Sequence, residues 1–157
     1  PMHADRLLRA AADAEAVVVG GRAAVLHGAS YVTVDLDLCV PREEAGRERL
    51  VAAVAPLHPY PRGIEPGLPF VWDARTIRDA DLFRLTTEAG DLDLLKHVPG
   101  VGDYEAVRAR SEEVVVGQTA VRVLSLDALI DAKRAMGRPK DVALLNELEA
   151  LRALRGA

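Results

Sequence analysis

Apolar and acidic residues alternate in two stretches of the chain, at the two-residue spacing of a half-buried β-strand. The first is VTVDLDLCV, residues 32–40, and the second is GDLDLLK, residues 90–96. The first should place Val34, Leu36 and Leu38 on one face and Thr33, Asp35, Asp37 and Cys39 on the other. The second should place Leu92 and Leu94 on one face and Asp91, Asp93 and Leu95 on the other. Each strand therefore presents two carboxylates on one side.

The remaining pattern predicts further helices and short strands. Helices are expected over residues 3–15, 21–28, 41–57, 125–137 and 139–154 and within 98–110. Pro41 should lie in the first turn of the third helix, Gly28 should end the second, and Ser125 should cap the helix over 125–137. Strands are expected at residues 17–19, 68–73, 81–90 and 91–96 and in a hairpin over 112–125, with a proline-rich loop over 56–69. The expected fold is α/β (α+β): a small mixed β-sheet with packed helices, ending in C-terminal helices.

Composition favours an ordinary globular protein, since 50% of the residues are hydrophobic and 28% are charged. The length of 157 residues fits one domain over 1–157, with a helical portion at about 125–155. The net charge of −4 disfavours a general nucleic-acid binder. No apolar run approaches the roughly 20 residues that span a bilayer, and residues 1–15 lack the apolar stretch of a signal peptide. We therefore expect a cytoplasmic protein without a membrane partner, which the lone Cys39 fits.

Gly20 and Gly21 separate the strand at residues 17–19 from the helix that follows. Glycine lets backbone N–H groups approach an anion, so this turn is a candidate phosphate site. The alternative is a tight turn that needs glycine only for its dihedral angles.

The aspartates of the two alternating stretches are candidate metal ligands. Asp35 and Asp37 lie about 6.6 Å apart along one strand face, and oxygen ligands of this kind suit Mg²⁺. If the second stretch pairs beside the first, Asp93 completes a cluster of three carboxylates, because Asp93 is central in its strand whereas Asp91 adjoins Gly90. Such a cluster can hold two metals about 3.5–4 Å apart. The alternative is a solvated strand face.

These motifs carry a resemblance to a known family. The pattern GG-x-A-x-x-x-H-G, then T-x-D-L-D-L, GDLDLL and finally LSLDALIDAKRAMGRPKDVALLNEL resembles the DNA polymerase beta-like nucleotidyltransferase superfamily. More narrowly, it is similar to minimal bacterial nucleotidyltransferases related to toxins of the abortive-infection type. The similarity extends over about residues 17–151, and the order of the motifs makes it specific.

The resemblance implies a role for each motif. Gly20 and Gly21 would hold the phosphates of an NTP, and Asp35, Asp37 and Asp93 would be catalytic and bind Mg²⁺ or Mn²⁺. Lys133 would reach the triphosphate from a helix, with Arg138 and Lys140 as further phosphate or acceptor contacts; for these cations the alternative is a solvated helix end. The partners would be the NTP, an acceptor that could be a tRNA, a protein or a small molecule, and a cognate toxin or antitoxin.

The chain departs from the family pattern at two positions. Many relatives have Ser where Gly21 stands and Arg where Tyr31 stands, so a phosphate contact would be missing, and Arg22 is a candidate to replace it. The function that the resemblance implies is transfer of an NMP from an NTP to an acceptor hydroxyl with release of pyrophosphate. Two other functions remain open: a catalytically weak or inert partner-binding or antitoxin-type module with the same fold, and a two-metal nuclease.

Other chemistry-bearing residues are expected to be structural. His27 should be packed or hydrogen-bonded in a helix, because Mg²⁺ prefers oxygen, and Phe70 and Trp72 should fill core.

Overall fold

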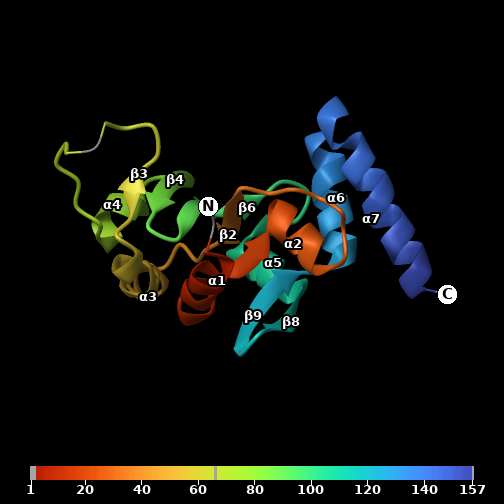
Figure 1. Ribbon diagram of the computed structural model, residues 1–157, viewed down its shortest axis with the longest axis horizontal. Helices are drawn as coiled ribbons and strands as arrows, with labels where there is room; N and C mark the ends of the chain where they lie inside the picture. The colour runs from red at the N-terminus through yellow and green to blue at the C-terminus, as the bar shows by residue number, and fades with distance from the viewer. Residues whose placement is uncertain (1–2, 66, 157) are drawn as a thin grey trace.

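A seven-stranded mixed sheet forms the centre of the computed structural model, which describes residues 3–65 and 67–156 (Figure 1). Its strands run in the order β3-β4-β5-β2-β1-β9-β8. They are β1 (Val17–Val19), β2 (Asp35–Cys39), β3 (Tyr60–Pro61), β4 (Leu82–Thr87), β5 (Gly90–Leu95), β8 (Ser111–Val116) and β9 (Thr119–Leu124). A separate ribbon pairs β6 (His97–Val98) with β7 (Gly102–Asp103).

Strand pairing makes the sheet mixed, as the sequence predicted. β2 is parallel to β5, and β1 is parallel to β9. The other neighbouring pairs are antiparallel, including β1 with β2 and the hairpin of β8 and β9. The parallel pair matters most for the site, because it sets the two acidic strands side by side in one direction.

Helices pack around this sheet and gather at its ends. They are α1 (Ala4–Asp13), α2 (Gly20–Leu26), α3 (Glu44–Val54), α4 (Ala74–Arg78), α5 (Tyr104–Ala109), α6 (Leu126–Met136) and α7 (Val142–Arg155), with 3₁₀ turns η1 (Ala55–Leu57) and η2 (Pro139–Asp141). α1 packs against β9, while α6 and α7 pack against each other at one end of the molecule (Figure 1). The α/β prediction with C-terminal helices is thus confirmed. Within the described residues no helix is both long and apolar enough to cross a membrane.

The apolar faces of the two acidic strands are buried in the core. Leu36, Leu38, Leu92 and Leu94 are at most 3% exposed, as the alternation predicted. The prediction for Val34 is wrong, since this residue is 74% exposed and precedes the strand. β1 ends at Val19, opposite Asp37, and the pairing of β2 with β5 begins at Asp35 opposite Asp91, so Val34 lies before the paired part of the strand.

The strand predicted over residues 68–73 does not form. Its aromatic residues are fixed by side-chain contacts: Trp72 Nε1 donates a hydrogen bond to the carbonyl of Val51 at 3.0 Å, and its ring packs edge-on against Phe83. Asp73 then caps α4 by accepting a hydrogen bond from the Thr76 amide at 2.7 Å. The helix α4 was not predicted from the sequence.

Several helix ends follow local chemistry. Ser125 caps α6 as predicted, because its Oγ accepts a hydrogen bond from the Ala128 amide at 3.2 Å. The helix expected to begin at Pro41 begins instead at Glu44. Residues 56–69 are not wholly loop, since Tyr60 and Pro61 pair with β4 at the sheet edge.

Candidate metal centre

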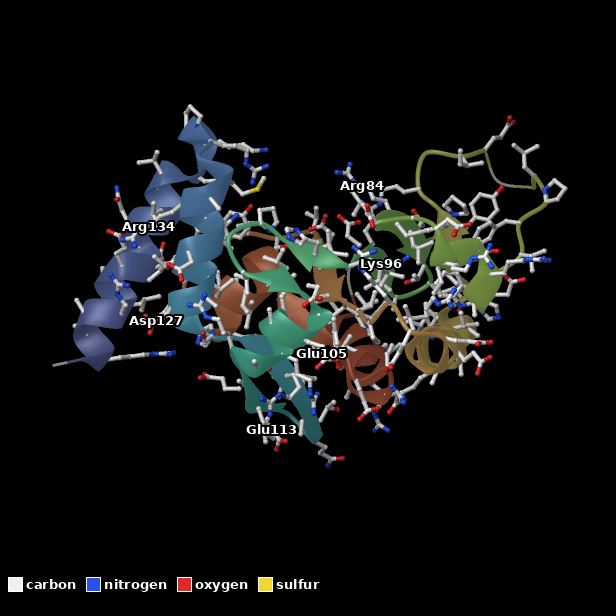
Figure 2. The ribbon with its side chains drawn as sticks, turned by 180° about the vertical axis from the view of Figure 1, so that it is seen from behind. Arg84, Lys96, Glu105, Glu113, Asp127 and Arg134 are labelled. Carbon is white, nitrogen blue, oxygen red and sulfur yellow. The ribbon has the colours of Figure 1, made fainter. Side chains whose placement is uncertain are left out.

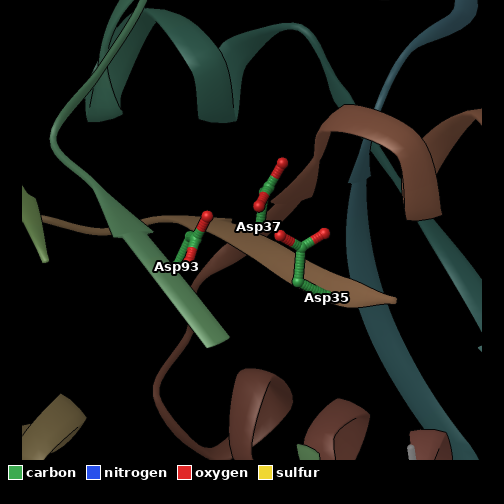
Figure 3. A group of neighbouring side chains, drawn as sticks. All are labelled: Asp35, Asp37 and Asp93. Atoms are coloured by element: carbon green, nitrogen blue, oxygen red, sulfur yellow. The ribbon is translucent and has the colours of Figure 1, made fainter. Parts of the chain in front are cut away.

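Three carboxylates converge on one face of the sheet. β2 and β5 lie parallel with Asp37 opposite Asp93, so the side chains of these two residues point the same way, and Asp35 lies two residues before Asp37 on the same face. Figure 3 shows the three carboxyl groups on the same side of the two strands. One oxygen from each lies within 4.8 Å of the others. The convergence expected from the alternation is therefore present in the structure.

Asp37 has the most unusual environment of the three. Burial is the main cause that raises the pKa of Asp37 from 3.8 to about 7. The neighbouring Asp35 and Asp93 carboxylates raise it further, while the ammonium of Lys133 lowers it in part. Asp37 Oδ1 is buried and has no hydrogen-bond partner among the described residues.

A divalent cation fits these residues. The donors are all carboxylate oxygens, which hard cations such as Mg²⁺ prefer, and an added positive charge would relieve the repulsion inside the cluster. Oδ1 of Asp37 also offers a ligand atom to which no group in the described part of the chain donates a hydrogen bond.

Gly20 brings the turn after β1 into contact with the cluster. Its φ of +66° lies in the left-handed region, and a Cβ atom at this position would collide with Oδ2 of Asp37. Val19 is the register partner of Asp37, so the backbone passes directly beside the carboxylate. The structure therefore requires glycine here for close approach as well as for its dihedral angles.

A cavity of about 540 Å³ opens beside Asp37 and Gly20. Part of its wall is apolar, with side chains from β5, β9 and α6: Leu95, Leu124, Leu129 and Met136. Three cations, Arg42, Lys133 and Arg138, also line it. Asp35 and Asp93 are beside Asp37 but are not among the lining residues. The space thus joins one carboxylate of the cluster to apolar surface and positive charge.

Lys133 and Arg138 are held near the cavity by Asp141. The carboxylate of Asp141, 8% exposed, lies 3.4 Å from Lys133 Nζ and 2.5 Å from Arg138 Nε. The two cations from α6 and the following turn are therefore fixed in place rather than free at a helix end. The exposed Lys140 neither lines the cavity nor makes an ion pair in the described part of the chain.

The second glycine of the turn is covered by a tyrosine. A Cβ atom at Gly21 would lie 2.5 Å from Cε1 of Tyr31. The neighbouring Arg22 is half-buried on α2 and is not among the cavity-lining residues. The suggestion that Arg22 replaces a phosphate contact stays a prediction.

Sequence reasoning missed three residues of this region. Arg62 lies 2.7 Å from Asp93 Oδ1, Asp141 fixes Lys133, and Arg42 lines the cavity. Arg62 follows the two-residue strand β3 in a proline-rich stretch, where no periodic pattern indicates which way a side chain points. Asp141 directly follows Lys140 in the GRPKD motif, so that motif was the signal that could have revealed it.

Residues expected to be structural do lie in structural environments. His27 is 6% exposed and its Nε2 lies 2.8 Å from the carbonyl oxygen of Leu124. Phe70 packs edge-on against Tyr60, and Cys39 is buried.

No family model matches the chain, and a search of curated proteins gives no significant match. The resemblance to nucleotidyltransferases therefore depends on the sequence motifs alone and stays a prediction.

Proposed function

We propose that this protein is a metal-dependent nucleotidyltransferase, which transfers a nucleoside monophosphate from an NTP to an acceptor hydroxyl. The observation that carries the proposal is the cluster of Asp35, Asp37 and Asp93 beside a glycine turn and a cavity lined by cations. An acidic cluster alone has many uses. The fixed ammonium of Lys133 on the same cavity adds a group that suits a triphosphate.

In the proposed reaction the acceptor oxygen forms a bond to the α-phosphorus of the NTP. The bond from that phosphorus to the bridging oxygen of the β-phosphate breaks, and pyrophosphate leaves. The proton of the acceptor hydroxyl passes to a carboxylate of the cluster, for which we assign Asp93. Mg²⁺ or Mn²⁺ bound by the three aspartates would neutralise phosphate charge and lower the pKa of the attacking hydroxyl.

The protein's own groups supply binding and orientation. The amides of the turn at Gly20 and Gly21 and the ammonium of Lys133 hold the phosphates, while the apolar wall around Leu124 and Leu129 receives the nucleoside. Asp35 and Asp37 would hold the metal ion, whose positive charge would attract the phosphates to this end of β2. Because every group is already placed by the sheet or by Asp141, catalysis would come from positioning and charge neutralisation.

The test is transfer of label from labelled NTPs to cell extract in the presence of Mg²⁺ or Mn²⁺, which also identifies the acceptor. Asp35→Asn and Asp37→Asn should each reduce the labelling of the acceptor by at least about 100-fold. This is the order of loss expected when a charged catalytic group is removed. Asp91→Asn is the matched control, since Asp91 is on β5 and faces the same side but is not part of the cluster. Its activity should stay within about threefold of wild type.

Full transfer by both Asp35→Asn and Asp37→Asn would reject the assignment. If the wild type neither labels an acceptor nor binds NTP with Mg²⁺ by calorimetry, the protein is a partner-binding or antitoxin-type module with this fold. Metal-dependent degradation of nucleic acid without NTP would identify a nuclease.

A further inference from the structure

Arg62 places a positive charge directly against the cluster. Its Nη2 lies 2.7 Å from Oδ1 of Asp93, and its Nε lies 3.5 Å from Oδ2 of Asp91. The side chain of Arg62 is 27% exposed and that of Asp93 is 13% exposed, so water screens this pair only in part. Oδ1 of Asp93 lacks a hydrogen bond of good geometry despite the short distance, so the contact is an ion pair.

Backbone carbonyls hold the guanidinium independently of the carboxylate. Nη2 of Arg62 donates to the carbonyl oxygen of Leu85 at 2.9 Å and to that of Leu92 at 3.4 Å. The Arg62 amide also donates to the carbonyl of Arg84 at 3.0 Å, which fixes its backbone to β4. These hydrogen bonds hold Arg62 in place whether or not a metal is bound to the aspartates.

The fixed positive charge of Arg62 makes the environment of Asp93 different from that of Asp35 and Asp37. One oxygen of Asp93 faces Arg62 at ion-pair distance, whereas the cation that acts on Asp37 is Lys133, which is fixed by Asp141 on the cavity side. Arg62 thus lowers the negative charge that a divalent cation meets at Asp93.

We propose that Arg62 is a positioning residue that orients Asp93 and weakens metal binding by the cluster. The orienting role rests on the proposed function, because it assigns Asp93 to the reaction, whereas the effect on metal binding does not. This inference predicts two changes of opposite sign when Arg62 is removed. Metal binding becomes tighter, and transfer becomes slower.

The experiment is a calorimetric titration of metal-free protein with Mn²⁺ in the absence of nucleotide. Arg62→Gln should bind Mn²⁺ about tenfold more tightly than wild type, the order expected when a unit charge a few ångströms from a divalent cation is removed. Arg84→Gln is the matched control, because it removes the same charge from the register partner of Asp93 on β4. Arg84 is exposed (Figure 2), and its side chain makes no ion pair or hydrogen bond in the described residues. The Arg84→Gln substitution should therefore change the Mn²⁺ affinity by less than about threefold.

Kinetics then separate positioning from simple loss of stability. Arg62→Gln should lower kcat by about tenfold or more and leave the KM for NTP within about threefold, because the phosphates are held by other groups. Arg62→Lys keeps the charge but not the planar geometry, so its Mn²⁺ affinity should stay within about threefold of wild type while kcat falls. If Arg62→Gln does not fold, the lysine variant carries the test, since tenfold tighter Mn²⁺ binding by it would overturn the inference.

The outcomes also distinguish this inference from the proposed function. Tighter Mn²⁺ binding by Arg62→Gln without any nucleotide transfer in the wild type would support the charge effect and reject the transferase. Metal-dependent transfer with unchanged or weaker Mn²⁺ binding by Arg62→Gln would reject the inference and leave the transferase standing. A wild type that binds no Mn²⁺ would overturn both.

Discussion

Tyr31 covers Gly21 so closely that a Cβ atom at Gly21 would lie 2.5 Å from Cε1 of the tyrosine ring. At these two positions the sequence resemblance predicts serine and arginine. A serine at residue 21 and the tyrosine at residue 31 would compete for the same space, so the two differences are structurally linked.

Gly21→Ser should therefore be destabilising on its own. The added side chain must displace the Tyr31 ring, and because this ring is 45% exposed the cost should be at the low end of the range for overpacking, about 1 kcal/mol. Tyr31→Ala should relieve it, so that the double variant regains most of the stability lost by Gly21→Ser. Urea denaturation of the four proteins gives the coupling free energy, for which we expect about 1 kcal/mol. Additive effects of the two substitutions would show that the ring moves aside without cost.

Gly20 permits a comparison between backbone strain and close contact. Gly20→Ala and Gly63→Ala both place alanine in the left-handed region, at φ of +66° and +83°. That conformation costs an L-residue about 1–2 kcal/mol. Only Gly20→Ala also drives a methyl group into Asp37, whereas no atom of the described residues lies within 4 Å of a Cβ at Gly63.

We expect Gly63→Ala to lower the free energy of unfolding by about 1 kcal/mol and leave Mn²⁺ affinity unchanged. Gly20→Ala should be more destabilising and should weaken Mn²⁺ binding by about tenfold or more, because it displaces a carboxylate of the cluster. Thermal denaturation and Mn²⁺ calorimetry measure the two effects. Equal behaviour of the two variants would mean that Gly20 is needed only for its dihedral angles.

Lys133 and Lys140 form a natural pair for testing the phosphate contact. Lys133 lines the cavity and is fixed by Asp141, while Lys140 is exposed and lies off the cavity. Lys133→Met should raise the KM for NTP by about 10- to 100-fold, whereas Lys140→Met should change it by less than about threefold. Steady-state kinetics at several NTP concentrations supply the values. Similar effects of both substitutions would indicate diffuse attraction rather than a specific contact.

The alternation of apolar and acidic residues placed the aspartates of each strand on one face, because a strand places every second side chain on the same side. Asp93 was preferred to Asp91 for its central position in the strand, and it lies opposite Asp37. The cluster also required the two strands to be neighbours, which was a condition of the prediction, and their direction was not predicted. The structure shows both, since β5 runs parallel beside β2 although 50 residues of chain lie between them.

What the sequence could not predict was the set of groups that arrive from irregular segments. Arg62 is placed by a hydrogen bond from its amide to β4 after a strand of only two residues, and no local pattern encodes that contact. The strand prediction for residues 68–73 was wrong because aromatic residues such as Trp72 are typical of strands. In the structure Trp72 is fixed instead by one side-chain hydrogen bond. In both cases tertiary contacts decide the conformation.

Asp37 should make the stability of the metal-free protein depend on pH. Its carboxyl group has a pKa of about 7 in the folded protein, chiefly through burial, against an ordinary value of 3.8. Between these two values the folded state binds the proton more tightly than the unfolded state, so the free energy of unfolding falls as pH rises. Below about pH 4 both states are protonated, and above about pH 7 both are ionised, so the loss is complete there.

Asp37→Asn removes this titration. The variant should match wild type most closely near pH 4 and should be more stable by on the order of 2 kcal/mol at pH 8, a value reduced for the partial exposure of the site. Urea denaturation with EDTA at pH 4, 6 and 8 measures the difference. Adding Mg²⁺ at pH 8 should then stabilise wild type more than the variant, because the ion binds the folded cluster and the asparagine removes one of its charged ligands. A stability difference that stays constant across this pH range would show that Asp37 carries no buried charge, and the electrostatic argument for a cation at the cluster would fail with it.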